Sequence, residues 1–334
     1  MPWSISMMKE ICITEMEEFY IGNAQNEAAG TGCTVIICEE GAVAGVDVRG
    51  GSPGTRETDA LNPCNLRRSI HAVILAGGSA FGLDAAGGVM RFLEEKGVGR
   101  DVLVTKVPIV CGAILFDLKC GDYRVRPDLQ MGYDTCRNAY NEHPKEGNYG
   151  AGTGATIGKA KGAEYAMKGG LGIVCYQAGA LKVGVVIAVN CVGDIFDPKL
   201  NRLIAGALSD DKQTLADSEE IMLSNYEDQT DFFSENTILG TVITNAKLDK
   251  AQVNKLASVS HNGIARTVRP AHTVYDGDTI FTMASGKVNA NPDVVAILAV
   301  RAVEQAILNA VKKADTAYGF KSYQEFSAIF DDIK

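Results

Sequence analysis

Thr237 stands where a threonine could act as a nucleophile. It follows Asn236 and an acidic segment that ends at Glu235, and it directly precedes Ile238–Thr244, an apolar run that predicts a strand. A threonine hydroxyl is a weak nucleophile unless a base lies beside it, and cleavage of the preceding peptide bond supplies one. The freed α-amine, with an ordinary pKa of about 7.7–8.0, is then a base within the same residue. On this pattern alone, a β-branched residue that merely opens a strand is the commoner interpretation.

Two carboxylates separated by one glycine, Asp276 and Asp278, stand just before Thr279–Met283, which also predicts a strand. At positions i and i+2 of a turn, they could point to the same side and hold an ammonium or hydroxyl group. An Asp-Gly sequence is also an ordinary turn, and turn preference alone favours that simpler interpretation.

The other motifs that could carry chemistry lack the context that they need. Gly150–Ala155 matches the loose dinucleotide pattern G-x-G-x-x-A, but the segment before it is polar and contains Pro144, so no strand leads into it. The pair Gly158-Lys159 lacks the first glycine and the Ser/Thr of a phosphate loop. The serine elbow G-x-S-x-G is absent, and the 4 histidines show no metal-ligand spacing on one helix. We therefore expect neither a nucleotide nor a metal.

The elements that must position these residues alternate between strands and helices along the whole chain. Apolar runs predict strands at Thr34–Cys38, Ala42–Val48, His71–Ala76, Gly172–Gln177, Leu181–Val189, Ile238–Thr244 and Thr279–Met283. Helical spacing of apolar residues predicts helices at Ala80–Lys96, Asp249–Arg266 and Asp293–Lys313. Glu39-Glu40-Gly41 predicts a hairpin between the first two strands, and Asn138–Asn148 predicts a polar loop. The fold class is therefore α/β or α+β, with substantial antiparallel pairing.

Composition excludes several classes of protein. Hydrophobic residues are 46% and charged residues 22% of the chain, as in ordinary globular proteins rather than disordered ones. Glycine accounts for 36 of the 334 residues without a three-residue period, which excludes collagen and indicates tight turns or close backbone approaches. The net charge of −9 and the absence of a Lys/Arg-rich run argue against a nucleic-acid partner.

The sequence also predicts where the protein works. Its best apolar run, Val183–Val189, is far shorter than the roughly 18 residues that span a membrane, and the N-terminus lacks the pattern of a signal peptide. The 9 cysteines include no C-x-x-C pair, which argues against a disulfide framework or a zinc ribbon. We expect a cytoplasmic protein with free thiols and no membrane partner.

Six sequence blocks, in this order, resemble one hydrolase family. They are GTGCTVIICEEGAVAGVDVRGGSPGTRETD, ILAGGSAFGLDAAGGV, GAGTGATIGKAKG, VIAVNCVGD, NTILGTVITNA and VRPAHTVYDGDTIF, and together they span Gly30–Phe281. The family comprises L-aminopeptidase/D-esterases, β-peptidyl aminopeptidases and nylon-oligomer (6-aminohexanoate-oligomer) hydrolases. Its members are known to cut themselves into an α and a β chain, and the first residue of the β chain is the nucleophile. This sequence resembles the Asn-Thr branch, which includes the nylon-oligomer hydrolases.

The resemblance implies that the chain is cut between Asn236 and Thr237, and that Thr237 is the nucleophile. Asp276 and Asp278 match the acidic pair of the family, which is expected to orient the hydroxyl and the protonated α-amine. Cleavage would yield an α chain of residues 1–236 and a β chain of residues 237–334 from one single domain.

Three further residues receive roles through the resemblance. Lys159, in GATIGK, matches a lysine near the nucleophile, and Asn190, in VIAVNCVG, matches an asparagine that helps to bind the oxyanion. The family often has a tyrosine where Phe116 stands in Ile114-Leu115-Phe116-Asp117. Because Phe116 lacks the phenol, we expect altered oxyanion binding or substrate preference and regard it as a candidate residue of the substrate pocket.

The resemblance further implies a four-layer αββα sandwich of the N-terminal-nucleophile-hydrolase kind, assembled as a homotetramer of αβ units without cofactor or metal. We expect a self-processing threonine amidohydrolase or aminopeptidase that hydrolyses small amino-terminal peptides or amides through an acyl-enzyme. A nylon-oligomer endohydrolase is the alternative within enzymes. A catalytically idle binding protein of the same fold is the alternative to an enzyme. Cleavage of the 236–237 bond would distinguish the enzyme from this binding protein.

Overall fold

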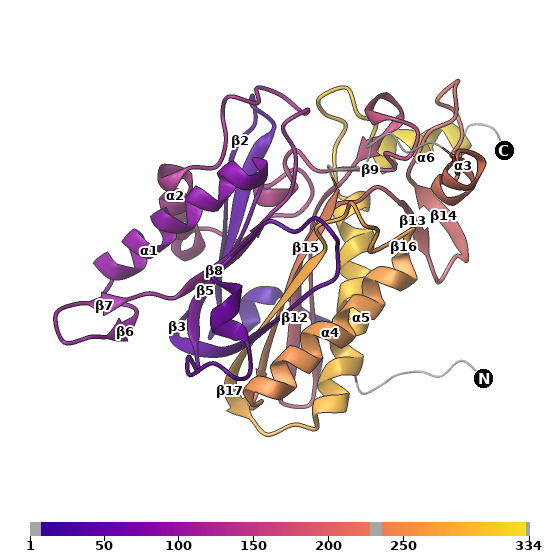
Figure 1. The fold of residues 1–334 in the computed structure, drawn as a ribbon. Helices are drawn as coiled ribbons and strands as arrows, with labels where there is room; N and C mark the ends of the chain where they lie inside the picture. The colour runs from indigo at the N-terminus through magenta and orange to yellow at the C-terminus, as the bar shows by residue number, and fades with distance from the viewer. Residues whose placement is uncertain (1–7, 228–235, 332–334) are drawn as a thin grey trace.

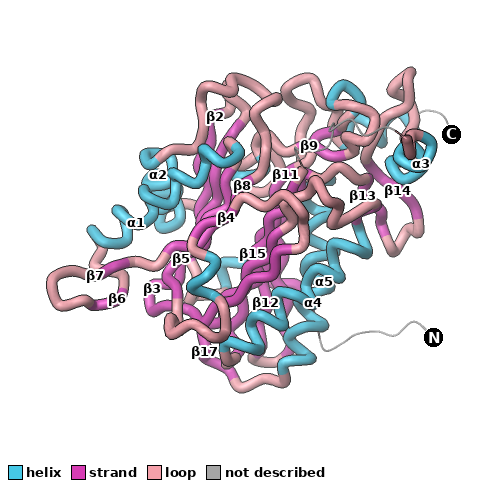
Figure 2. Tube along the Cα trace, viewed as in Figure 1, coloured by secondary structure: helices cyan, strands magenta, loops and turns pink. Residues whose placement is uncertain are grey.

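Two β-sheets lie face to face between two layers of helices (Figures 1 and 2). The computed structural model describes residues 8–227 and 236–331. In Figure 1, α1 (Ala85–Glu95) and α2 (Leu129–Asn141) lie on the left, and α4 (Lys250–Thr267) and α5 (Pro292–Lys312) lie on the right. The four-layer αββα arrangement expected from the sequence is confirmed.

One long strand, β3 (Thr31–Val48), belongs to both sheets. Its first half pairs with β2 (Tyr20–Asn26) and β5 (Ile70–Ala76), and its second half pairs with β17 (Thr279–Val288). The first sheet is completed by β8 (Val110–Ile114) and β4 (Thr55–Arg56). The second sheet is completed by β1 (Lys9–Ile11), β11 (Gly170–Ala178), β12 (Leu181–Asn190) and β15 (Thr237–Ala246).

Shorter elements surround this framework. They are the strands β6 (Arg100–Asp101), β7 (Lys106–Val107), β9 (Thr156–Ile157), β10 (Met167–Lys168), β13 (Asp194–Asp197), β14 (Arg202–Ala205) and β16 (Val268–Arg269), with the helices α3 (Ser218–Ser224) and α6 (Tyr323–Asp331).

The core consists of three apolar clusters, each between two neighbouring layers. In β12, the side chains of Val185 and Ile187 pack in a cluster with residues of α4 and α5, whereas those of Val186 and Ala188 belong to the cluster between the two sheets. The third cluster joins the first sheet to α1 and α2. Successive side chains of a strand point to opposite faces, so a strand buried on both sides becomes apolar throughout. This explains the continuous apolar run in β12.

The predicted hairpin around Glu39-Glu40-Gly41 is wrong, because the chain continues through these residues as one strand. Ile37 pairs with Ala72 and Ala42 pairs with Ile70, so the segment between them forms a bulge in β3. Gly41 has φ +81°, a conformation that glycine adopts without steric penalty. A bulge interrupts the apolar alternation much as a turn does, which is why the sequence pattern favoured a turn.

Helix α2 was not predicted, and its last turn occupies the start of the polar loop expected at 138–148. The helix is capped by Asp128, whose side chain accepts a hydrogen bond from the Met131 backbone N–H at 2.8 Å. Its fully buried positions hold only small residues, namely Gly132, Thr135, Cys136 and Ala139. The apolar stripe that reveals a helix is therefore weak in this segment.

Helix α5 is long and apolar enough to cross a membrane by length and composition, and it is the only such helix within residues 8–227 and 236–331. However, 61% of the apolar window is buried inside the fold. Its apolar residues, such as Val303 and Ile307, pack in the cluster that α5 shares with the second sheet. The hydrophobicity of α5 is thus accounted for by its place as a core helix.

Candidate active site

The Asn-Thr and Asp-Gly-Asp motifs meet because β15 and β17 are parallel neighbours. Helix α4 connects the two strands, so both begin at the same edge of the sheet. Leu239 pairs with Thr279, and just before the two strands Asn236 forms a bridge with Asp276. Residues 40 positions apart in the chain are therefore neighbours in space, as the bond from Ile238 to Asp278 shows.

Thr237 is buried, with 5% of its surface exposed, and its hydroxyl contacts the peptide bond that precedes it. The Oγ1 atom hydrogen-bonds to the carbonyl oxygen of Asn236. The same oxygen accepts the backbone N–H of Gly277 at 2.8 Å. A Cβ on Gly277 would lie 2.6 Å from Thr237 Oγ1, so only glycine brings its N–H to this place without a collision. The hydroxyl and a hydrogen-bond donor thus converge on one carbonyl group.

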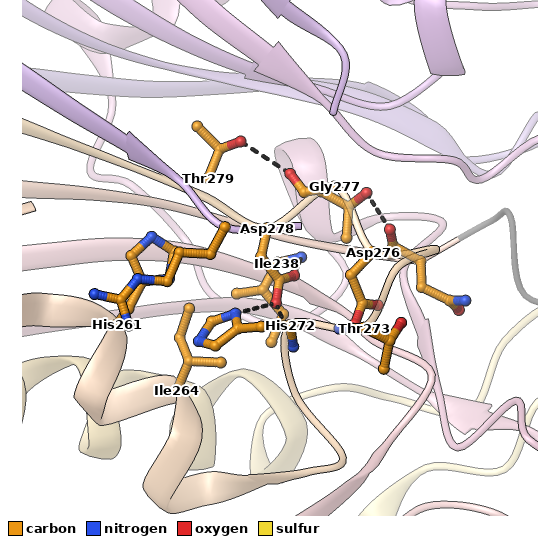
Figure 3. A network of polar contacts seen from close by, with 12 residues as sticks. Ile238, His261, Ile264, His272, Thr273, Asp276, Gly277, Asp278 and Thr279 are labelled. Atoms are coloured by element: carbon orange, nitrogen blue, oxygen red, sulfur yellow. Dashed lines mark hydrogen bonds and ion pairs between the residues drawn. The ribbon is translucent and has the colours of Figure 1, made fainter. Parts of the chain in front are cut away.

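Beside Thr237, the carboxylates of Asp276 and Asp278 accept hydrogen bonds from backbone N–H groups, and Asp278 also contacts a histidine ring (Figure 3). Asp278 Oδ1 accepts the backbone N–H of Ile238 at 2.7 Å, and Asp278 Oδ2 lies 2.8 Å from Nδ1 of His272. Asp276 Oδ2 accepts the backbone N–H of Thr273 at 2.6 Å. Both carboxylates are 1% exposed, so the turn buries two acids beside the threonine.

Burial raises the pKa of Asp276 to about 6, and the negative charge of Asp278 acts in the same direction. The Thr273 hydrogen bond and the ammonium of Lys159 act against this rise. In the described part of the chain, Asp276 Oδ1 has no hydrogen-bond partner. Asp276 can therefore exchange a proton near neutral pH.

Lys159 and Asn190 lie on the other side of Thr237. Asn190 ends β12 and pairs with Thr237 across the sheet. Lys159 Nζ donates to both the carbonyl oxygen and Oδ1 of Asn190, each at 3.1 Å. Asn190 Oδ1 also accepts the backbone N–H of Thr156 at 2.9 Å, which fixes the amide plane. The lysine and the asparagine therefore form one buried polar unit.

Phe116 joins the same unit through its main chain. Its carbonyl oxygen accepts a hydrogen bond of 3.0 Å from Nδ2 of Asn190, and its side chain is partly buried. The sequence-based expectation concerned the missing phenol, whereas the observed polar contact uses the backbone that any residue has. All seven residues singled out from the sequence therefore belong to one connected set of contacts, and their individual roles stay predictions.

Two parts of this environment were not predicted. No role was predicted for His272, but its ring contacts Asp278. No role was predicted for the loop after β3 either. In the fold, the Arg49 backbone N–H donates to Asp278 O and the Ser52 backbone N–H donates to Asp276 O, each at 2.9 Å. The nearest sequence signal for His272 was its place in the same turn, a few residues before the acidic pair.

The arrangement has the parts that acyl transfer requires. A hydroxyl contacts a carbonyl group, a backbone N–H donates to the carbonyl oxygen, and buried acids and a lysine surround them. No cluster of three or more His, Cys, Asp or Glu that could hold a metal ion occurs among the residues that the structure describes. The side chains present suit nucleophilic attack on an amide, with charge stabilised by hydrogen bonds.

Comparisons with known proteins agree with this chemistry. The family model described as Peptidase family S58 matches residues 12–324. An uncharacterised aminopeptidase of Mycobacterium leprae is 39% identical over 316 residues, which cover 87% of this chain and 85% of that protein. A 6-aminohexanoate-oligomer endohydrolase of Kocuria is 27% identical over 311 residues, covering 87% and 83% of the two chains.

A solved structure supports the fold. The L-aminopeptidase D-Ala-esterase/amidase of Ochrobactrum anthropi superimposes with a TM-score of 0.68 at 17% identity, over 96% of this chain and 94% of that one. That enzyme is described as a variant of the Ntn-hydrolase fold. Identity at this level supports the common architecture, and the assignment to a family depends on the sequence matches.

Proposed function

Because this chain belongs to peptidase family S58 and is an amide-bond hydrolase, we propose that it activates itself by cutting its Asn236–Thr237 bond and then works through Thr237 as an N-terminal nucleophile. The observation that carries the proposal is the convergence of the Thr237 hydroxyl and the Gly277 N–H on the Asn236 carbonyl. Self-cleavage would need a nucleophile and a donor for the developing oxyanion at that bond, and these two groups support it.

In the first step, Thr237 Oγ attacks the carbonyl carbon of Asn236. The new C–O bond replaces the C–N bond of Thr237, and the hydroxyl proton passes to the departing nitrogen, which becomes the free α-amine. Water then hydrolyses the ester, which leaves a carboxylate on Asn236 and restores the hydroxyl of Thr237. Negative charge develops on the Asn236 oxygen, and the Gly277 N–H at 2.8 Å stabilises it there.

In the second step, the freed Thr237 attacks the amide carbon of a substrate. Its α-amine accepts the hydroxyl proton and delivers it to the leaving amine, so an acyl-enzyme ester forms. Water completes hydrolysis. Once the carbonyl of Asn236 has moved away, the Gly277 N–H is available to a substrate carbonyl. The same donor thereby serves both reactions.

Small peptides or amides with a free amino terminus are the substrates that we propose. The relative with 39% identity is named as an aminopeptidase, whereas the named oligomer endohydrolase has 27% identity. Two buried carboxylates beside the nucleophile also provide negative charge for a substrate ammonium group. Oligoamide endohydrolysis is the second candidate, supported by the endohydrolase relatives and by the lysine at position 159.

The proposed enzyme is a homotetramer of αβ units in the cytoplasm, as the family resemblance and the cysteine pattern indicate. Both properties stay predictions. Phe116 stays a pocket candidate, supported by the hydrogen bond that its carbonyl oxygen accepts from Asn190.

Self-cleavage is tested on purified protein by denaturing electrophoresis and by N-terminal sequencing of the fragments. We expect two fragments, of residues 1–236 and 237–334, with Thr237 as the new N-terminus. Thr237→Ala should remain uncut, while Thr237→Ser, which keeps a hydroxyl, should be cut. A wild-type chain that stays whole on long incubation would contradict the proposal and favour a binding protein. A panel of aminoacyl amides, β-peptides and aminohexanoate oligomers then separates the two substrate classes.

A further inference from the structure

His272 is held against the acidic pair by two hydrogen bonds to the same oxygen. Its ring Nδ1 lies 2.8 Å from Asp278 Oδ2, and its backbone N–H donates to that oxygen at 3.2 Å. Its backbone has φ +59°, which is uncommon for a residue with a side chain. This conformation brings both the backbone N–H and the ring of His272 to the Asp278 carboxylate. The two hydrogen bonds to Asp278 therefore accompany an unfavourable backbone conformation at His272.

The chemistry of the partners fixes which ring atom carries the hydrogen. Both oxygens of Asp278 already accept a backbone N–H, Oδ1 from Ile238 and Oδ2 from His272 itself, so Nδ1 of His272 is assigned as the donor in its contact with this carboxylate. Behind it, the ring of His261 packs edge-on at 4.8 Å between centroids. His261 is fully buried and its Nε2 lies 3.0 Å from the carbonyl oxygen of Asp47, which only accepts. Both imidazoles therefore have a defined orientation (Figure 3).

Asp278 links this pair of rings to the nucleophile. While Oδ2 faces His272, Oδ1 accepts the backbone N–H of Ile238, the residue directly after Thr237. Rotation of the carboxylate would break both contacts together. Proteins commonly fix the orientation of a functional carboxylate by a hydrogen bond to the oxygen that does not face the reacting group, which here is Oδ2 of Asp278.

We propose that His272 is a positioning residue of the threonine site: by donating from Nδ1 it locks Asp278 so that its other oxygen holds the backbone next to Thr237. His261 supports the ring from helix α4. The inference deepens the proposed function, since it assigns a residue that acts on the self-cleaving threonine through Asp278. The role assigned to His272 is therefore one of positioning, through Asp278, and not a catalytic one.

The surroundings allow a pH measurement to be interpreted. Burial lowers the pKa of His261 to about 4, so this ring is neutral in the range where Asp276 titrates. The charged or titratable groups that act on the acidic pair and the two rings are Asp47, Lys159, Cys191, His261, Asp276 and Asp278, with Arg49 paired to Asp47 at the edge. A rate profile measured across the pH range where Asp276 titrates therefore contains no contribution from ionisation of His261.

Two substitutions separate positioning from simple packing. His272→Gly removes the ring but adopts a positive φ without strain, and it keeps the backbone N–H. His272→Asn also tolerates that φ and places an amide donor near the position of Nδ1. The matched control is His71→Asn, at a buried histidine whose Nδ1 accepts the Ile109 N–H on the other sheet, away from the site. Thermal unfolding of each variant identifies any loss of fold.

The experiment follows conversion of uncut, cell-free-synthesised chain into fragments between pH 5 and 9. We expect His272→Gly to slow cleavage about 10- to 100-fold across this pH range, which is the range for loss of one hydrogen bond to a charged group. His272→Asn and His71→Asn should stay within about threefold of wild type on the same reasoning.

The inference is overturned if a folded His272→Gly variant cleaves at the wild-type rate, or if His272→Asn is as slow as His272→Gly. Failure of the wild-type chain to cleave at all would instead contradict the proposed function. The two failures are distinguishable because the wild-type time course is measured in the same experiment.

Discussion

A methyl group added at position 277 should stop the protein from cutting itself while leaving its fold intact. In Gly277→Ala, the new Cβ would lie 2.6 Å from Thr237 Oγ1, 3.1 Å from Ser52 O and 3.3 Å from Thr237 Cγ2. Ordinary carbon–oxygen contacts need about 3.4 Å or more, so the hydroxyl must move by roughly 0.8 Å. Gly277 is not among the glycines with positive φ, so alanine suits the backbone and keeps the N–H.

The size of the expected effect follows from this displacement. A misplacement of about 1 Å at a reacting atom can lower a rate on the order of 100-fold, because the attacking oxygen leaves its near-attack geometry. We expect a loss of that order in the rate of self-cleavage. The melting temperature should change little by comparison, since the closest contact is with a side chain and the Ser52 backbone oxygen, at 3.1 Å, needs to move by only a few tenths of an ångström.

The assay is a time course of the two fragments on denaturing gels, with the new N-terminus identified by mass spectrometry. Gly240→Ala is the matched control, because Gly240 lies on the same strand as Thr237 and its added Cβ would meet nothing closer than 3.4 Å. If Gly277→Ala is cut as fast as Gly240→Ala, the steric argument for the hydroxyl position is wrong.

Two further predictions concern buried charge. Asp276→Asn should slow self-cleavage, yet raise the free energy of unfolding at pH 7 by about 1–3 kcal/mol. The pKa of Asp276 in the folded protein, about 6, lies above its ordinary value of 3.8. Ionisation of Asp276 therefore opposes folding as the pH rises from about 4 to above 6, and asparagine removes this cost. The gain should vanish near pH 4 in denaturant titrations, and an equal gain at both pH values would contradict the assignment. Lys168→Met should lower the free energy of unfolding by about 3 kcal/mol, since the fully buried Nζ donates to the carbonyl oxygens of Gly152, Ala155 and Gly169 and methionine leaves them without a donor. The same titration checks it, with exposed Lys255→Met as the control.

The strands and helices could be predicted where burial follows a simple period. Helix α5 begins within a residue of its predicted start, and β5, β12 and β15 lie within a residue or two of their predicted bounds. The failures occurred where that period is hidden. Helix α2 buries only small residues, and the bulge at Gly41 interrupts alternation without ending β3.

The candidate site shows the same division. Thr237, Asp276 and Asp278 could be named because their types and spacing carry chemistry and because the surrounding blocks resemble a hydrolase family. His272 could not, since a lone histidine after a proline has no pattern of its own. Its role emerges only when the turn, with φ +59°, folds it back onto Asp278.

The sequence by itself predicted the candidate reactive groups and the mixed α/β class from residue types and local periodicity, and its resemblance to one hydrolase family predicted the family. Only the tertiary structure decided that β15 and β17 lie parallel, so that a backbone N–H from one motif donates to the carbonyl beside the hydroxyl of the other. It also decided that Asp276 is buried beside a second acid, which raises its pKa to about 6. Strand register and burial are set by contacts between residues far apart in the chain, and no short stretch of sequence contains both partners of such a contact.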